Sequence, residues 1–403
     1  MNVTYINKLN IIVLSLILLT ACSKASADNN GNNDSTKEEE IKKADLDSYM
    51  NLPIRRLVDS LQLKNFYIGV ANGYYHQDDL SYVIAKREFS YITPTNDFKQ
   101  STVHPTFDKW DWSRPDLLVR NCRNNKQVIR MHGPISPQCS PWVKDDNRTA
   151  SQLTQMLNEY TIELYKRYNK SASLIQWMDV VNETIATSHI SGGENYPDVE
   201  AGDWFSSRTG NDSWENPWTI IGYDESSEIK VPLYIDMAFK NADEYAPDIK
   251  HVINEHGQLE EIVWEKMKKL VKYLRNKGRR VDGLGWQCHI DAGWEKIPGN
   301  LERLDSIIKW CHENDLEFHV TEMNVWMKDQ YNEDDQASTI GEILRVLLQN
   351  NETGVVTLNF WNIKDKDTPY DSWHGCVWDD NCAPRKAYTR IKEELIRRAK
   401  ELI

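Results

Sequence analysis

The chain has 403 residues, with 61 acidic and 48 basic side chains and a formal net charge of −13. This balance argues against a nucleic-acid partner, because binding a phosphate backbone requires clustered Lys and Arg side chains. A hydrophobic content of 40%, with 15 Trp and 18 Tyr, indicates one tryptophan-rich globular body.

The N-terminal segment predicts export. Lys8 precedes the apolar run 9–19, which ends at the small residues Ala21 and Cys22. A run this short behind a basic residue is typical of a secretion signal rather than of a spanning helix. Residues 19–22 (LTAC) resemble the bacterial lipobox, which implies a signal peptide over 1–22, lipidation of Cys22 and a cell-envelope location, at the outer membrane surface or in the periplasm. The alternative is an ordinary signal peptide in which Cys22 is incidental.

Residues 23–50 are polar and poor in aromatic side chains, which predicts a flexible tether. The remaining segment, 51–403, is long for an ordinary domain but normal for an α/β barrel with loop insertions. Within it, eight apolar runs predict strands at residues 66–70, 89–93, 128–131, 174–181, 251–253, 284–286, 318–320 and 355–360.

Apolar residues at helical spacing predict helices between these strands, at residues 153–168, 259–274, 301–310 and 340–348. Eight strands alternating with helices, without a hairpin signal, predict an α/β fold of the (β/α)8 TIM-barrel type. The one oversized connection, 184–230, is rich in Gly, Ser, Asp and Trp. We expect it to lie over the active-site face.

Two of the strand-like runs end in a carboxylate. The segment 177–183 (WMDVVNE) ends at Glu183, and 319–322 (HVTE) ends at Glu322. Enzymes built on parallel barrels place their chemistry at the C-terminal ends of the strands. Two carboxylates at that edge are the minimum set for cleaving a glycosidic bond, whereas a surface or structural role for either glutamate is the alternative.

Four motifs in order make residues 60–395 resemble glycoside hydrolase family 10, the endo-xylanase family. The family's WDVVNE motif is matched by WMDVVNE at 177–183, with one residue inserted after the Trp, and its ITELD by VTEMN at 320–324. Its DGIGxQxH is matched by DGLGWQCH at 282–289, and its WGxxD by WNIKD at 361–365.

The resemblance implies a retaining mechanism in which Glu183 is the general acid/base and Glu322 the nucleophile, with the two carboxyl groups about 5 Å apart and their pKa values held apart. It implies that Asn182 binds the sugar 2-hydroxyl and that His289, with Gln287 beside it, orients the nucleophile. The remaining sugar-binding positions that it implies are Asn96, Lys99, His132, Trp361 and Trp373.

The resemblance is weakest in the second and third strands. Thr95, Gln100, Ser136 and Pro137 replace larger polar or aromatic side chains of the family. We therefore expect a wider glycone pocket that favours a substituted β-glycan over an undecorated xylan chain. The alternative is that the 184–230 loop supplies substitute contacts through Trp204, Trp214 or Trp218.

Besides Cys22 the chain has six cysteines, at 122, 139, 288, 311, 376 and 382. In an exported protein these can pair, and a bridge between Cys376 and Cys382, which flank a short turn, is the first expectation. Their spacing does not match a zinc site, and no metal or organic cofactor is implied.

Three functions are compatible with these observations. The favoured one is a retaining endo-acting β-glycanase that hydrolyses xylan or a decorated β-glycan and acts as a monomer. The second is a glycosidase of the same barrel clan acting on another polysaccharide, such as a glucan or galactan. The third is a lipid-anchored glycan-binding protein with little turnover, which the presence of both glutamates, Asn182 and His289 argues against.

Overall fold

The computed structural model describes residues 46–73, 79–145, 147–188, 199–205 and 216–403. The chain divides into two units, 1–44 and 45–403. The predicted signal peptide, Cys22 and nearly all of the predicted tether therefore lie outside the described residues. Within these residues no helix combines the length and the apolar composition needed to cross a membrane.

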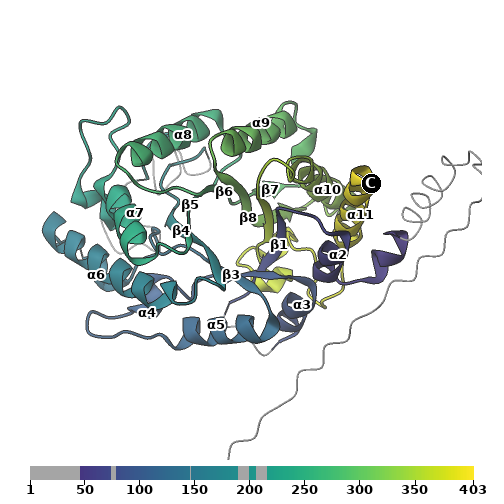
Figure 1. Ribbon diagram of the computed structural model, residues 1–403, viewed down its shortest axis with the longest axis horizontal. Helices are drawn as coiled ribbons and strands as arrows, with labels where there is room; N and C mark the ends of the chain where they lie inside the picture. The colour runs from purple at the N-terminus through teal and green to yellow at the C-terminus, as the bar shows by residue number, and fades with distance from the viewer. Residues whose placement is uncertain (1–45, 74–78, 146, 189–198, 206–215) are drawn as a thin grey trace, which may run out of the picture. The chain divides into compact units, whose positions relative to one another are not determined.

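Eight parallel strands close into a barrel at the centre of the second unit (Figure 1). Neighbouring strands pair in chain order, and the pairing of β1 with β9 and of β6 with β8 completes the ring. The strands are β1 (Phe66–Ala71), β2 (Tyr91–Thr93), β3 (Val128–Met131), β4 (Ile175–Asn182), β5 (Lys250–Glu255), β6 (Gly283–Trp286), β8 (Glu317–Trp326) and β9 (Val356–Phe360).

Helices surround the barrel and connect its strands (Figure 1). They are α2 (Ile54–Leu61), α3 (Leu80–Glu88), α4 (Gln100–Val103), α5 (Ser113–Asn125), α6 (Ala150–Asn169), α7 (Leu233–Tyr245), α8 (Glu261–Asn276), α9 (Asn300–Glu313), α10 (Glu333–Gln349) and α11 (Lys386–Leu402). The predicted (β/α)8 barrel is confirmed.

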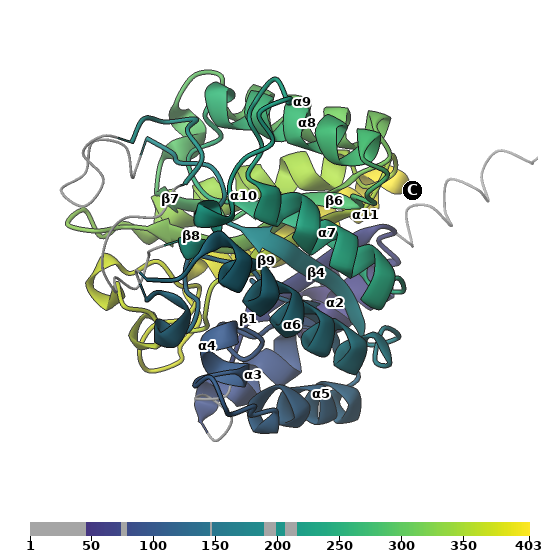
Figure 2. The same cartoon turned by 90° about the vertical axis from the view of Figure 1, so that its left-hand side faces the viewer.

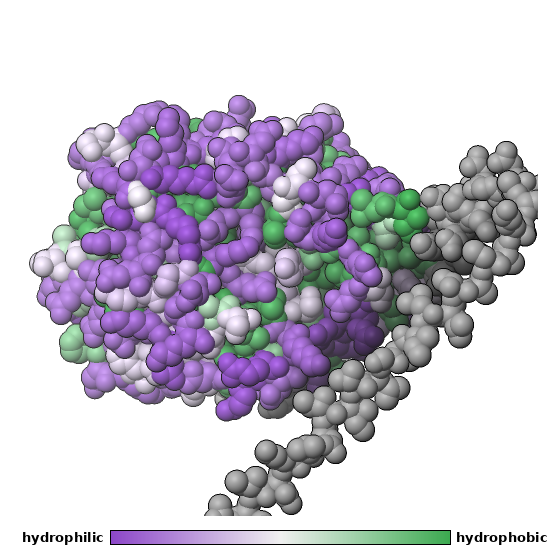
Figure 3. All heavy atoms as spheres, viewed as in Figure 1, coloured by the Kyte–Doolittle hydropathy of each residue, from purple (hydrophilic) through white to green (hydrophobic). Residues whose placement is uncertain are grey.

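Local sequence explains why these helices begin and pack where they do. Thr149 and Gln152 form a reciprocal capping box that satisfies two free backbone N–H groups at the start of α6. The same helix then buries Leu153, Leu157 and Leu164 at helical spacing against the barrel. The face of the protein seen in Figure 3 is mostly hydrophilic, with smaller apolar areas among the hydrophilic side chains. Burial of one face of each helix thus places the core between helices and strands.

Two differences from the predicted strands bear on function. The β5 strand extends past residue 253 to Glu255, and β8 extends past residue 320 to Trp326. A short further strand, β7 (His289–Asp291), pairs with the end of β8. These extensions carry additional polar side chains to the C-terminal ends of the strands, where the connecting loops gather on the left of Figure 2.

The predicted bridge between Cys376 and Cys382 is wrong, because both thiols are free. The Cys376 Sγ lies inside the protein, 3.7 Å from the Trp361 carbonyl oxygen, whereas Cys382 is only partly buried. Cys122, Cys288 and Cys311 are also buried free thiols. Burial raises the pKa of the Cys122 thiol to about 12, so that thiol remains protonated at neutral pH.

Candidate active site

Three residues that lie one or two positions after barrel strands adopt a left-handed backbone conformation. Glu183 follows β4 with φ 57°, Cys288 follows β6 with φ 61°, and Asn362 follows β9 with φ 73°. Such conformations cost roughly 1–3 kcal/mol for residues other than glycine and are found at functional sites. Here they turn the chain sharply at the C-terminal end of the barrel.

Glu322 is buried within β8 among three basic side chains. His289 Nε2 lies 3.5 Å from its Oε2, and His132 Nδ1 lies 3.7 Å from its Oε1. Burial raises the pKa of Glu322, but the charges of His132 and His289, the His289 hydrogen bond and the charge of Lys99 outweigh burial and hold that pKa at about 2. Glu322 is therefore an ionised carboxylate at neutral pH, as a nucleophile must be.

A chain of side-chain amides connects the two glutamates. Asn254 donates to Glu322 Oε1 (2.8 Å) and to Asn182 Oδ1 (2.7 Å). Gln287 Nε2 donates to Glu183 Oε1 (2.9 Å) and to Asn182 Oδ1 (3.3 Å). The Asn182 oxygen thus accepts two hydrogen bonds from inside the barrel, which leaves its NH2 group as a donor for a ligand.

Two residues inside the barrel, Thr321 and Gly285, fix the orientation of the Asn254 side chain. Its Oδ1 accepts a hydrogen bond from the Thr321 hydroxyl (2.7 Å). A Cβ atom added at Gly285 would lie 2.4 Å from that oxygen, so only glycine leaves room for it. The second glycine of the predicted DGLG motif is therefore needed for close packing beneath the site.

Glu183 is partly exposed, in contrast to Glu322. The backbone after it is held by Glu255, whose Oε2 accepts hydrogen bonds from Thr184 N (2.9 Å), Thr184 Oγ1 (3.0 Å) and Ile185 N (3.0 Å). Burial raises the pKa of Glu255 to about 7. Glu255 is thus a positioning residue for the Glu183 turn.

Two histidines that contact Glu322 have fixed orientations. His132 Nδ1 lies 3.0 Å from the buried Asp179, which also pairs with Arg130 through two hydrogen bonds. The second histidine, His289, lies with its Nδ1 3.1 Å from Asn324 Oδ1.

Asn324 fixes which ring nitrogen of His289 carries a proton. Its Nδ2 donates to the Trp361 carbonyl (2.9 Å), so its Oδ1 faces the ring and accepts from Nδ1. A proton on Nε2 as well would allow His289 to donate to Glu322. The arrangement supports the orienting role predicted for this histidine.

The two predicted sugar-binding tryptophans, Trp361 and Trp373, contact different groups of side chains. Trp361 packs edge-on to His132 and His289, with ring centroids 5.2 and 6.4 Å away. Trp373 stacks on Tyr370 at 4.6 Å and meets Trp326 edge-on at 4.8 Å. Both Trp361 and Trp373 remain partly exposed.

Comparisons with known proteins agree with this geometry. The family model described as glycosyl hydrolase family 10 matches residues 57–394. The chain belongs to glycosyl hydrolase family 10. It is 26% identical over 370 residues to endo-1,4-beta-xylanase B of Thermotoga neapolitana, covering 87% of this chain and 94% of the relative.

A second relative is much longer than this chain. Endo-1,4-beta-xylanase A of a Caldicellulosiruptor species is 28% identical over 323 residues, and the match covers 75% of this chain but 42% of the relative. Among solved structures, xylanase 10B from Thermotoga petrophila in complex with xylobiose has a TM-score of 0.70 at 24% identity, covering 87% and 98% of the two chains. At that identity the structural likeness supports the barrel fold.

The second-strand residues of this family 10 member lie at different depths. Lys99 is buried, and its Nζ donates to Gln138 Oε1 (2.7 Å). Burial lowers the pKa of Lys99, and the charges of Glu183 and Glu322 oppose that effect. Asn96 is exposed and has no side-chain hydrogen bond to a described residue.

The residues that depart from the family pattern are less well paired. Gln100 is buried, and its Oε1 accepts from Ser140 N (3.3 Å), so it ties two loops together rather than facing solvent. Its Nε2 and the buried Ser136 hydroxyl have no partner among the described residues. Gly133, with φ 58°, packs between Ser136 and Lys99.

The 184–230 loop does not supply the predicted replacement rings through Trp204 or Trp218. Trp204 is buried, and its indole N–H donates to the Ile229 carbonyl (2.7 Å). Trp218 is only 1% exposed. Trp214 lies outside the described residues.

Sequence reasoning missed several side chains of the site. Asn254 and Glu255 end β5. The sequence pattern that could have identified them is an apolar run that stops at polar residues, as in the runs before Glu183 and Glu322. Trp326 lies parallel to the His289 ring at 5.9 Å, at the end of the extended β8. Gln138 had no sequence signal, because its contact with Lys99 joins two loops. The described residues contain no cluster of three or more His, Cys, Asp or Glu side chains arranged to hold a metal ion.

Proposed function

We propose that this glycoside hydrolase cleaves a β-glycan with retention of configuration, with Glu322 as nucleophile and Glu183 as general acid/base. The observation that carries the proposal is the buried Glu322 carboxylate with its pKa held at about 2, joined through Asn254, Asn182 and Gln287 to the partly exposed Glu183. One carboxylate fixed in its charged form and a second one that is partly exposed match the requirements of a two-step displacement.

In the first step, a Glu322 oxygen attacks the anomeric carbon while Glu183 transfers its proton to the glycosidic oxygen. The bond between that carbon and the glycosidic oxygen breaks, the aglycone leaves, and a glycosyl ester of Glu322 forms. Glu183 is now ionised and removes a proton from water. The water oxygen attacks the same carbon and releases Glu322, which restores both carboxyl groups.

Asn182 and His289 support the transition state. The Asn182 NH2 group, which has no partner among the described residues, donates to the hydroxyl next to the anomeric carbon, a contact that strengthens as positive charge develops on the sugar. The His289 side chain holds the second Glu322 oxygen, so the attacking oxygen keeps its direction.

We infer that the substrate is xylan or a related decorated β-glycan cleaved within the chain. Relatives named endo-1,4-beta-xylanases support the backbone sugar. The unpaired Ser136 hydroxyl supports a substituted glycone side, since a buried polar group requires a partner that a ligand hydroxyl supplies. Lys99, His132 and Gln138 line the same side.

A screen of purified protein on linear and substituted β-glycans, with chromatography of the products, tests this assignment. We expect internal cleavage, shown by mixed oligosaccharides early in the reaction, and a higher kcat/KM on substituted than on linear oligosaccharides of equal backbone length. Efficient cleavage of unsubstituted xylotetraose would contradict the wide glycone pocket. Release of a single sugar size from one chain end would contradict endo action.

We also propose that the protein is an exported lipoprotein anchored through Cys22 and acting as a monomer. The LTAC segment at 19–22 and the polar stretch that follows support a lipid anchor on a tether. Mass spectrometry of the mature N-terminus should find a diacylated cysteine, and Cys22→Ser should abolish fractionation with membranes. A mature protein that begins at an unmodified residue would refute the anchor.

A further inference from the structure

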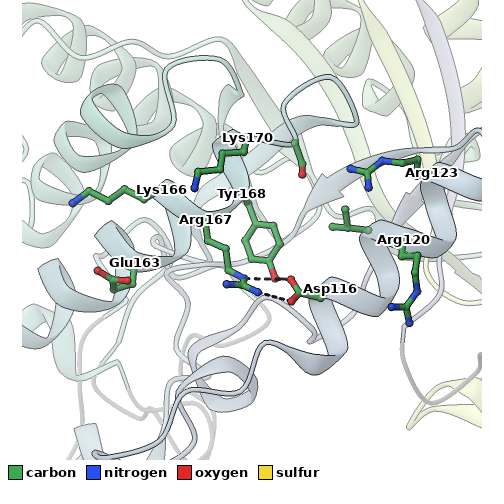
Figure 4. A pocket seen from close by; sticks show the side chains of 10 residues that line it. Asp116, Arg120, Arg123, Glu163, Lys166, Arg167, Tyr168 and Lys170 are labelled. Carbon is green, nitrogen blue, oxygen red and sulfur yellow. Dashed lines mark hydrogen bonds and ion pairs between the residues drawn. The ribbon is translucent and has the colours of Figure 1, made fainter. Parts of the chain in front are cut away.

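A groove of about 580 Å³ lies between α5 and α6 on the outside of the barrel (Figure 4). Arg120 and Arg123 line it from α5, and Lys166, Arg167 and Lys170 line it from the α6 side. Only two acidic side chains, Asp116 and Glu163, oppose these five cations. The groove is therefore basic in a chain whose net charge is −13.

Most of this positive charge is not neutralised by the protein. Asp116 is occupied by Arg167, which binds it through two hydrogen bonds, and by the Tyr168 hydroxyl (2.8 Å). Arg120, Arg123 and Lys170 are exposed, and their charged groups form no ion pair with another described residue. Unpaired cations placed side by side repel each other and attract a multivalent anion.

Aromatic rings adjoin the groove. The Arg167 guanidinium lies over the Trp112 ring, 4.9 Å from its centroid. Trp112 begins a row of ring contacts that continues through Trp110, His104 and Trp142 to Phe107. Phe107 is 69% exposed and lies in the connection from β2 to α5, at the end of the barrel that carries the active site. Aromatic faces beside a polar groove suit a sugar chain, whose rings are apolar on their faces and polar at their edges.

We propose that the α5–α6 groove is a second, non-catalytic binding site for a β-glycan that carries carboxylate groups, such as uronate side groups. The inference rests on the proposed function, which makes a decorated glycan the substrate. Arginine binds carboxylates through paired hydrogen bonds, and the lysines add charge without fixed geometry. Retention at the groove raises the local concentration of polymer at the catalytic cleft.

The lining of the groove favours a glycan over an anionic membrane. Surfaces that bind membranes combine cations with exposed apolar side chains that enter the lipid. Val119, the aliphatic side chain of the groove, is only 6% exposed. A concave, polar groove fits a carboxylate-bearing chain rather than a flat layer of headgroups.

Binding of the full chain to insoluble uronate-bearing xylan tests the proposal, with Glu322→Gln present in every variant to prevent cleavage. The test variant is Arg123→Glu with Lys170→Glu, and the control is Lys240→Glu, at an exposed lysine on α7. We expect the double variant to bind about tenfold more weakly or worse, because two charge-assisted contacts are lost. The control should bind like the parent protein.

The ligand group is tested with the same polymer after reduction of its carboxyl groups to alcohols, which the parent protein should retain poorly. Equal retention of reduced and native polymer, or unchanged binding of the double variant, overturns the proposal. If the double variant loses binding to phosphatidylglycerol vesicles but binds the polymer like the parent protein, the groove binds lipid instead.

Kinetics separate this proposal from the proposed catalytic function. With Glu322 intact, the double variant should hydrolyse a small aryl β-glycoside at the parental kcat/KM and show a raised KM on uronate-bearing polymer. A parent protein that hydrolyses no glycan but binds the polymer through the groove refutes the catalytic assignment alone. A KM on polymer equal to that of the parent refutes the groove.

Discussion

The two sides of the active site differ in how completely their polar groups are paired. On the side formed by β4, β5, β6 and β8, the amides of Asn182, Asn254 and Gln287 bind one another and both glutamates. On the side formed by the loops after β2 and β3, Ser136 and Gln100 retain polar atoms without a described partner. The shared hydrogen bonds of the first side fix the positions of the two glutamates, whereas the unpaired atoms of the second side leave contacts for the substrate to complete.

The largest expected effect comes from removing the two glutamates at the ends of the hydrogen-bonded amide chain. Glu322→Ala and Glu183→Ala should each lower turnover of polysaccharide by several orders of magnitude, because in the proposed mechanism each removes a group that exchanges a bond or a proton with the substrate. External azide should restore turnover by Glu322→Ala, and NMR should identify the product as the α-glycosyl azide. Inverted products from the parent enzyme would refute the two-step mechanism.

Disrupting the middle of the same network should have the next largest effect. Asn254→Asp places a second carboxylate where an amide now lies 2.8 Å from Glu322 Oε1. Repulsion raises the pKa of Glu322 and shifts its position, so kcat/KM should fall by about 10²-fold. Asn241→Ala, which removes a buried amide hydrogen-bonded to Asn158 and Thr161 on the outer helices, should lower the melting temperature with kcat/KM preserved. Equal losses of activity in both variants would mean that Asn254 is only structural.

Removing Trp361 or Trp373 should have an intermediate effect on activity. Trp361→Ala and Trp373→Ala should each weaken transition-state binding by about 1–3 kcal/mol, the range of aromatic stacking in other binding sites. Trp310→Ala on α9 is a matched control, because Trp310 is also partly exposed and pairs with Lys268 away from the site. Normal kinetics with a lowered melting temperature would show that Trp361 and Trp373 only pack.

The smallest expected effect is a shift in pH dependence. His289→Gln removes a positive charge and the hydrogen-bond donor that hold the pKa of Glu322 at about 2. The pKa of Glu322 should rise, so the acidic limb of kcat/KM should move to higher pH by about one unit. His312→Gln, at the end of α9, should leave that limb unchanged.

The same low pKa has a consequence for stability. The ordinary pKa of a glutamate is about 4.3, so ionised Glu322 stabilises the folded state above that pH. This contribution should decline as the pH falls from about 4.3 towards 2. Urea unfolding at several pH values should show a shallower loss of stability in His289→Gln than in the parent protein.

The barrel and its two glutamates could be predicted from the sequence because both depend on local patterns. A strand buried on both faces must be apolar, so a carboxylate at the end of such a run is visible without any knowledge of its neighbours. The runs ending at Glu183 and Glu322 satisfy this condition: Glu183 directly follows β4, and Glu322 lies in β8 two residues past Val320, the last residue of β8 that pairs with β6. Strand ends were less accurate, because β5 and β8 continue through polar residues that pair within the barrel.

Contacts between distant segments decided the rest. Asn254 acquires its place between the glutamates only when β5 lies between β4 and β6, and the Gly285 position must lack a side chain for Asn254 to fit. Cys376 and Cys382 stay unpaired although they are close in sequence; the Cys376 thiol is buried beside the Trp361 carbonyl, whereas Cys382 is only partly buried. Trp204 and Trp218 carry the same side chain as Trp361, yet the fold buries the first two and leaves the third partly exposed beside His132. Residue type sets which chemistry is available, and packing between segments far apart in the chain sets where that chemistry is exposed.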